Sequence, residues 1–360
     1  MASMRLLVDD FVQRGYFGVI LTGGEPTLHP ELPGICRYAR EQGLHVRMIT
    51  NGHRLAEPKF AKAMAEAGLQ SVHISIYSTR PEVETVLRGG NTGTLERAYR
   101  AIENVADCGV DVHMNSVIAK QNADHLDETV AYFIEHYPFI RHYVWNCLDP
   151  SMGRAEVNQT LYTPRLAEFE VSLQRSLDLL NDSGRTFRVE KVPLCYMTDY
   201  GWASTETRNI VKMEERIVHF LDDKQMVRIT HHGHLYAEAC NSCELRPICG
   251  GLFNRGDGYD PAELAPVFVP MKEIVNRILT DSEGDPTHVS MTYEEWQKAF
   301  AVHNAELEAH SHDEPPTVVD GPAVGKVTER GKRVYESKRA TEGRKADRGG
   351  VVLEKGVPSD

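Results

Sequence analysis

Two kinds of segment alternate without interruption from the start of the chain to residue 148. Short runs of apolar and β-branched residues are typical of buried strands, and amphipathic helical segments separate them. Several of the helical segments end at a glycine. Strands that alternate with helices pair in parallel, because each helix returns the chain to the same end of the sheet. The expected strands are 17–22, 45–50, 71–77, 111–118 and 142–148, and the expected helices are 4–15, 30–42, 58–67, 94–107 and 124–136.

The first of these strands ends in the sequence Gly23-Gly24-Glu25-Pro26. Two adjacent glycines let a ligand approach the backbone closely, and the proline stiffens the turn and removes a donor. The glutamate places a carboxylate at the carboxyl end of the strand, where parallel α/β folds bind their ligands. The alternative is a tight strand-to-helix turn that binds nothing, since a pair of glycines is common in such turns.

The run Leu21-Thr-Gly-Gly-Glu-Pro-Thr27 resembles the second-strand motif of radical S-adenosylmethionine (SAM) enzymes. In that family the backbone and the glutamate of the motif hold the amino group of SAM, which chelates one iron of a 4Fe-4S cluster. Thr50-Asn51-Gly52 resembles the third-strand signature, and polar residues at later strand ends follow in the family's order. Taken singly, each could instead be a cap or a surface charge. The resemblance implies cofactor-binding roles for Gly23, Gly24, Glu25, Pro26, Asn51, Ser75, Arg88 and Asn115.

The expected fold is an α/β, partial (β/α)6 TIM-like barrel that lacks its first strand. The family's core has six strands, whereas five are expected here. The family's first strand carries a Cys-x3-Cys-x2-Cys motif for the catalytic cluster, and that spacing occurs nowhere in this sequence. Cys36 lies within an expected helix and is interpreted as a packing residue. An N-terminal truncation is the favoured explanation, and a degenerate, non-catalytic family member is the alternative.

A second cysteine pattern, Cys240-x2-Cys243-x5-Cys249, lies far downstream. Cys195 could supply a fourth thiolate, and four thiolates satisfy a 4Fe-4S cluster. The pattern is similar to the auxiliary-cluster domains of the SPASM and twitch types, although a further cysteine expected near Phe253 is absent, so one auxiliary cluster is expected. A structural zinc site is the competing interpretation, since four-cysteine spacing alone does not separate the two.

Composition narrows the class of protein. A net charge of −12 argues against a general nucleic-acid binder. No apolar run approaches the length of a spanning helix, and the N-terminus has no signal-peptide pattern, so no membrane partner and a cytoplasmic location are expected. Seven cysteines, an odd number, favour metal ligation over disulfides. Cys108 and Cys147 are expected to be buried thiols, and His231, His232 and His234 are not assigned as ligands.

The expected domain organisation follows from these patterns. Residues 206–221 are expected to be helical, and the segment after 305 is too polar to form a core. The expected units are a core at 1–150, a linker helix at 151–190, a twitch- or SPASM-like domain at 191–275, a helical extension at 276–304 and a disordered tail at 305–360.

The resemblance implies a radical SAM enzyme that uses a 5′-deoxyadenosyl radical on an unidentified substrate, which is a peptide or a small molecule. Its cofactors would be SAM and the auxiliary 4Fe-4S cluster, with flavodoxin or ferredoxin as reductant. The chain as written is expected to be inactive alone, because it lacks the three-cysteine motif. The alternatives are a catalytically dead scaffold with the same fold and a zinc-stabilised interaction protein.

Overall fold

The fold was examined in a computed structural model of the chain. The structure describes residues 2–310 except 152, 215, 220–225, 230–231, 233, 254–257 and 282–290. His231 and most of the expected tail therefore lie outside the described residues.

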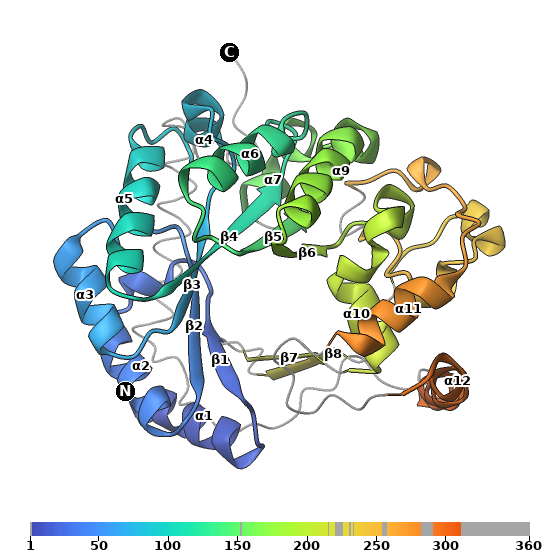
Figure 1. Ribbon diagram of the computed structural model, residues 1–360, viewed down its shortest axis with the longest axis horizontal. Coiled ribbons are helices and arrows are strands. Elements are labelled where there is room, and N and C mark those ends of the chain that lie inside the picture. The colour runs from blue at the N-terminus through green and yellow to red at the C-terminus, as the bar shows by residue number, and fades with distance from the viewer. Residues whose placement is uncertain are drawn as a thin grey trace.

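A parallel sheet curves into a half-barrel with helices on its outer side (Figure 1). Its six strands follow the sequence in their order across the sheet, and every neighbouring pair is parallel. The expected partial α/β barrel is therefore confirmed. The strands are β1 (Gly18–Leu21), β2 (His45–Thr50), β3 (Ser71–Ser75), β4 (Asp111–Ile118), β5 (His142–Cys147) and β6 (Thr186–Glu190). The helices of this region are α1 (Ala2–Gln13), α2 (Leu32–Glu41), α3 (Pro58–Glu66), α4 (Pro81–Leu87), α5 (Thr94–Asp107), α6 (Leu126–His136), α7 (Gly153–Val157), α8 (Gln159–Tyr162) and α9 (Leu166–Asp182).

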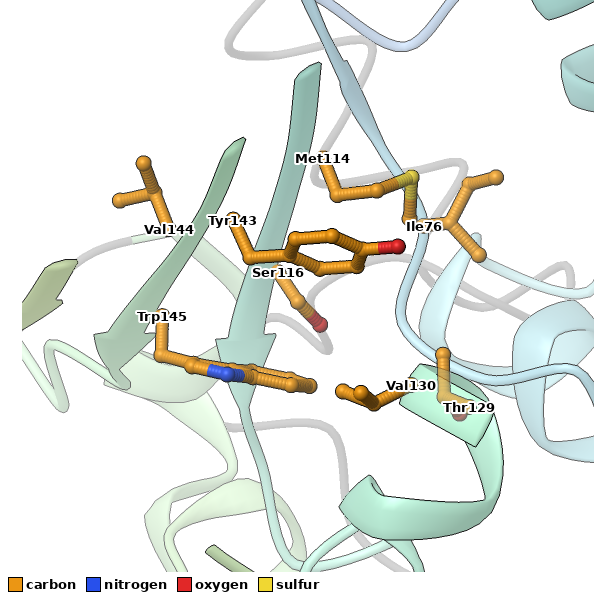
Figure 2. Close-up of a pocket in the computed structure, with 8 residues that line it drawn as sticks. All are labelled: Ile76, Met114, Ser116, Thr129, Val130, Tyr143, Val144 and Trp145. Carbon is orange, nitrogen blue, oxygen red and sulfur yellow. The ribbon is translucent and has the colours of Figure 1, made fainter. Parts of the chain in front are cut away.

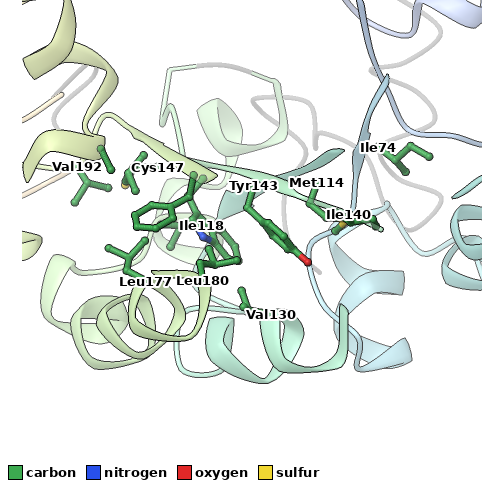
Figure 3. Packing of buried hydrophobic residues seen from close by; sticks show 14 of the residues in the cluster. Ile74, Met114, Ile118, Val130, Ile140, Tyr143, Cys147, Leu177, Leu180 and Val192 are labelled. Atoms are coloured by element: carbon green, nitrogen blue, oxygen red, sulfur yellow. The ribbon is translucent and has the colours of Figure 1, made fainter. Parts of the chain in front are cut away.

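The hydrophobic core lies between the outer face of the sheet and these helices. Figure 3 shows Ile118 and Tyr143 from the sheet packed with Val130 of α6 and Leu177 of α9. In β2, β4, β5 and β6, buried and mostly apolar side chains on this face alternate with more exposed, mostly polar side chains on the inner face. This alternation leaves the inner face free to carry chemistry.

The sheet has one strand more than the sequence analysis counted. β6 was assigned to a linker because its inward residues, Thr186, Arg188 and Glu190, interrupt the apolar run that a buried strand normally shows. The structure places it beside β5, with His142 opposite Thr186. The tally of five strands was therefore wrong. At the other edge of the sheet, β1 pairs with no strand other than β2 among the described residues.

Other expectations also need correction. The helix expected at 206–221 ends early, as α10 (Thr205–Lys212), and is followed by β7 (Arg216–His219), which pairs with β8 (Met226–Ile229). Helix α4 was not expected at all. Cys108 is exposed rather than buried, whereas Cys36 and Cys147 are buried as expected. The last described helix, α12 (Tyr293–His310), enters the segment expected to be disordered.

The C-terminal region packs against the end of the half-barrel at β6 (Figure 1). It contains α10, α11 (Met271–Thr280), α12 and several short turns that carry the cysteines. The hydroxyl of Tyr259 donates to the carbonyl of Leu148 at 2.7 Å and lies 3.0 Å from the Cys147 sulfur, which ties this region to β5. No helix in the described part of the chain is both long and apolar enough to cross a bilayer.

Candidate functional site

The ends of β1 and β2 are joined by the side chain of Glu25. Its Oε1 accepts hydrogen bonds from the Thr27 hydroxyl at 2.6 Å, the Thr27 amide at 3.1 Å and the Thr50 hydroxyl at 2.6 Å. Its Oε2 accepts the Asn51 amide at 2.8 Å. The carboxylate is therefore held by the protein itself, and a ligand at this loop meets chiefly the backbone.

The backbone ahead of Glu25 is open. Gly23 has φ of +130°, a conformation that side chains rarely adopt. A Cβ added at Gly23 or Gly24 would meet no atom within 4 Å. Glycine is thus required here by the chain's conformation, and free space lies beside both residues. This arrangement fits a small ligand that approaches the main chain, such as the amino group of SAM.

A row of polar side chains crosses three further strands towards their carboxyl ends. The side-chain amide of Asn146 donates to Oδ1 of Asn115 at 3.1 Å, and the side-chain amide of Asn115 donates to the Ser75 hydroxyl at 3.3 Å. The structure thus brings together two residues that the sequence analysis selected. It adds Asn146, whose signal was its position near the end of the last expected strand.

Arg88 lies near this row but is braced within the protein. Its Nε donates to Glu84 at 2.8 Å, and its Nη2 donates to the carbonyl of Ser75. Glu84 is fully buried and also accepts the amides of Tyr77 at 2.9 Å and Ser78 at 3.1 Å. Sequence reasoning missed Glu84, although its place four residues before Arg88 on a helix permits an ion pair. The role of Arg88 towards a cofactor carboxylate stays a prediction.

Ser78, His125 and Asp124 have the connectivity of a hydrolase triad. His125 lies 2.8 Å from the Ser78 hydroxyl through Nε2 and 2.5 Å from Asp124 through Nδ1. The Ser78 hydroxyl is buried and already accepts the amide of Arg80 at 3.0 Å. A nucleophile must reach its substrate, so this array acts as a tie between loops rather than as a catalytic triad.

The four downstream cysteines lie on short turns of the C-terminal region. Backbone amides donate to two of their sulfurs at 3.3 Å, from Val267 to Cys243 and from Gly251 to Cys249. Burial raises the pKa of Cys195 to about 11 and raises the pKa of Cys249, and the neighbouring cysteine sulfurs add to both shifts. Cys195 and Cys249 thus each lie within electrostatic reach of two other cysteine sulfurs.

No three metal-binding side chains among the described residues are arranged to hold a single metal ion. A zinc ion bound to thiolates at about 2.3 Å requires all sulfurs to converge on one centre. In a 4Fe-4S cluster each cysteine instead ligates its own iron, so the sulfurs lie farther apart. As for Cys36, burial raises its pKa to about 12, which keeps it a packed thiol.

One small cavity lies on the outer face of the sheet, against α6 (Figure 2). Its volume of about 10 Å³ suits at most one water molecule. Ser116, Thr129 and Trp145 line it with polar atoms that have no partner among the described residues. It is a gap in the core with room for one bridging water. It is separate from the group formed by Glu25, Ser75, Arg88, Asn115 and Asn146, which we call the strand-end site.

Comparisons with known proteins agree with this geometry. The model of the Radical SAM superfamily matches residues 2–133. Fe-coproporphyrin III synthase of Methanosarcina barkeri is 35% identical over 118 residues, which cover 33% of this chain and 29% of that protein. PqqA peptide cyclase of Ruegeria pomeroyi is 27% identical over 202 residues, which cover 54% of this chain and 53% of that protein.

Among solved structures, native anSMEcpe with bound AdoMet superposes with a TM-score of 0.49 at 16% identity, covering 86% of this chain and 89% of that one. The chain spans about a third of the length of the first curated relative and about half of the second. The matched segment, residues 2–133, contains the Gly23–Pro26 loop, Ser75, Arg88 and Asn115. Residues 2–133 thus match the Radical SAM superfamily.

Proposed function

We propose that this chain is part of a radical SAM enzyme that binds SAM at the carboxyl edge of the half-barrel and acts on a peptide. The observation that carries the proposal is that the open Gly23–Gly24 backbone and the polar row of Ser75, Asn115 and Asn146 belong to the same parallel sheet, towards the carboxyl ends of its strands. Parallel α/β folds bind ligands at this edge.

Each group at the edge has a definite task in this proposal. The carbonyls of Gly23 and Gly24 accept the amino group of SAM, while Glu25 keeps the loop in shape through Thr27, Thr50 and Asn51. Ser75 and Asn115 offer polar atoms to the rest of the cofactor. Arg88 supplies positive charge for its carboxylate, although Glu84 offsets part of that charge. When bound, SAM and a reduced iron–sulfur cluster supply radical chemistry.

The Cys-x3-Cys-x2-Cys spacing occurs nowhere in this sequence, so no residue of the chain is assigned to the catalytic cluster. For Cys195, Cys240, Cys243 and Cys249 we propose one auxiliary 4Fe-4S cluster. The amide donors to the Cys243 and Cys249 sulfurs support this proposal, because such hydrogen bonds stabilise thiolates and tune clusters. Flavodoxin or ferredoxin is the proposed class of reductant.

A peptide substrate is proposed because one relative is named as a peptide cyclase. The rival is a scaffold protein that keeps the fold and the cysteines without radical chemistry. The two proposals differ in SAM binding and in the formation of 5′-deoxyadenosine when a reduced cluster is present.

SAM binding tests the edge site directly. Equilibrium dialysis with labelled SAM should show saturable binding to the wild type and a loss of about tenfold or more for Gly23→Ala, because a side chain strains the loop that presents the carbonyls. Gly184→Ala is the matched control, since Gly184 also has positive φ and open space but lies after α9. If Gly23→Ala binds SAM as tightly as Gly184→Ala does, SAM does not bind at the strand-end site.

The metal proposal has its own test. Anaerobic reconstitution should load about four irons per chain, and Cys243→Ala should lose most of them along with part of the stability. Cys108→Ala is the control, because Cys108 is exposed and far along the chain from the cluster. Stoichiometric zinc without iron uptake would favour the zinc-stabilised alternative.

A further inference from the structure

A band of polar side chains crosses the inner face of the sheet below the strand-end site. It consists of Arg47, Ser71, His73, His113 and His142, which we call the inner band. Arg47 of β2 is opposite Ser71 of β3, and His73 is opposite His113 of β4. The three imidazole rings contact one another, with centroid distances of 4.9 Å, 5.4 Å and 5.9 Å. Four neighbouring strands thus contribute to one polar surface.

Three members of the inner band lack hydrogen-bond partners among the described residues. Arg47 is half-buried and makes no ion pair or hydrogen bond there, and the Ser71 hydroxyl and Nδ1 of His113 are buried without a partner. By contrast, Nδ1 of His142 lies 2.7 Å from the Thr186 hydroxyl. Buried polar groups in native proteins are almost always paired, and an unpaired group lowers stability. Two such buried atoms on adjacent strands, beside the half-buried guanidinium of Arg47, therefore indicate a missing partner.

The charge around the inner band is unbalanced. Burial lowers the pKa of His73 to about 3 and of His113 to about 4, and the cationic Arg47 contributes to both shifts. Burial and nearby positive groups, including Arg188 and Arg47, hold the pKa of His142 well below its usual value. Asp111 acts in the opposite direction on the pKa of His113 but is exposed. Asp281 lies 3.6 Å from Arg188 and 2.7 Å from Arg208. The inner band itself therefore contains a cation and no carboxylate.

We propose that the inner band binds an oxyanion, and that in the enzyme this anion is a carboxylate of the substrate. A guanidinium offers a planar fork that matches a carboxylate, and a hydroxyl and imidazole N–H groups add donors beside it. The anion supplies the charge that Arg47 lacks. Its identity as substrate rests on the proposed function, whereas the oxyanion site does not.

Two other occupants account for less of the geometry. A metal ion needs converging ligands, and the described residues contain no such group. A water molecule could pair with Ser71 and His113, but it does not neutralise Arg47. Only an anion addresses both the unpaired donors and the charge.

The test follows the imidazole carbon–proton signals of protein labelled with ¹³C-histidine. Succinate and inorganic phosphate are the anionic probes, and uncharged succinamide is the neutral one. We expect both anions to shift the signals of His73, His113 and His142 saturably and to raise their pKa values, because a nearby negative charge favours the imidazolium. Single His→Asn variants assign the signals, and succinamide should produce no saturable shift.

Arg47→Met should weaken both anions by about tenfold or more, since it removes hydrogen bonds to a charged group. Arg47→Lys should keep part of the affinity through its charge. Arg100→Met is the matched control, because Arg100 is exposed on α5. The melting temperature checks folding, and Arg47→Met should match or exceed the wild type because it removes an unpaired, half-buried cation.

If neither succinate nor phosphate produces saturable shifts, the oxyanion site is overturned. The same holds if Arg47→Met shows the same shifts as the wild type. Binding of phosphate but not succinate would overturn the carboxylate assignment. SAM is not present in this experiment, so failure of the inner band leaves the SAM-binding test at Gly23 unaffected, and failure at Gly23 leaves the inner band unaffected.

Discussion

The strand-end site and the inner band lie on the same sheet but differ in how their polar groups are paired. At the strand ends, the Glu25 carboxylate and the Arg88 guanidinium have partners within the protein. In the inner band, Arg47 has none among the described residues, and Ser71 and His113 each carry an unpaired buried atom. Paired groups hold loops in position, whereas unpaired groups lower the stability of the unliganded protein and are available to a ligand. The comparison therefore separates groups that already have partners in the protein from groups that have none among the described residues.

The largest effect expected from this comparison comes from breaking a paired group. Glu84→Ala leaves Arg88 as a buried, uncompensated charge and frees the amides of Tyr77 and Ser78. We expect a loss of about 3–5 kcal/mol in the free energy of unfolding, measured by urea denaturation. Glu82→Ala, on the exposed side of α4, is the control and should change little. A loss as small as that of the control would mean that the pair is not a brace.

The inner band should make stability depend on pH. The folded protein keeps His73 and His113 neutral down to pKa values of about 3 and about 4, whereas the unfolded chain protonates them near pH 6.5. Stability from the neutral rings is thus complete above about pH 6.5 and decreases as the pH falls towards the folded pKa values. At pH 5 the loss is about 2 kcal/mol per ring, at 1.36 kcal/mol per pKa unit.

Urea denaturation between pH 7 and pH 5 measures this slope. His73→Phe should flatten it by removing one titrating ring, and His136→Gln, exposed at the end of α6, should leave it unchanged. A saturating anion in the inner band should also flatten it, since bound anion favours protonated rings. A slope that His73→Phe does not alter would place the titration elsewhere.

The smallest expected effect is within the polar row at the strand ends. Asn146→Ala removes the hydrogen bond to Asn115 and should cost about 1 kcal/mol, read from the urea midpoint. It should also weaken SAM binding, because Asn115 loses the group that orients it. Asn181→Ala, on the exposed end of α9, is the control. If affinity for SAM is unchanged while stability falls, the row serves the fold alone.

Much of this architecture was predictable from local sequence patterns. Apolar runs separated by amphipathic segments predicted five of the strands and most of the helices of the barrel. These elements could be predicted because each has a hydrophobic periodicity within a short stretch of sequence. β6 was not predicted because Arg188 and Glu190 interrupt its apolar residues. Only its pairing with β5 shows that this segment is a strand of the sheet. The Gly23–Pro26 loop was found because it is contiguous in sequence.

The inner band could not be predicted in the same way. Its members lie on four strands, and whether Arg47 meets Ser71 depends on a register that spans 24 residues of chain. Glu84 was missed for a related reason, since nothing in its local sequence shows that the amides of Tyr77 and Ser78 turn towards it. Pairing across distance is set by the packed fold rather than by local preference.

The position of β1 at the sheet edge has a consequence for measurement by hydrogen exchange. Because β1 is bonded to β2 alone among the described residues, its outward amides should exchange with deuterium faster than those of the central strands. The Gly23–Pro26 loop continues directly from this strand. A molecule held by that loop should therefore slow deuterium uptake along β1, so that this edge reports occupancy without any chemical turnover.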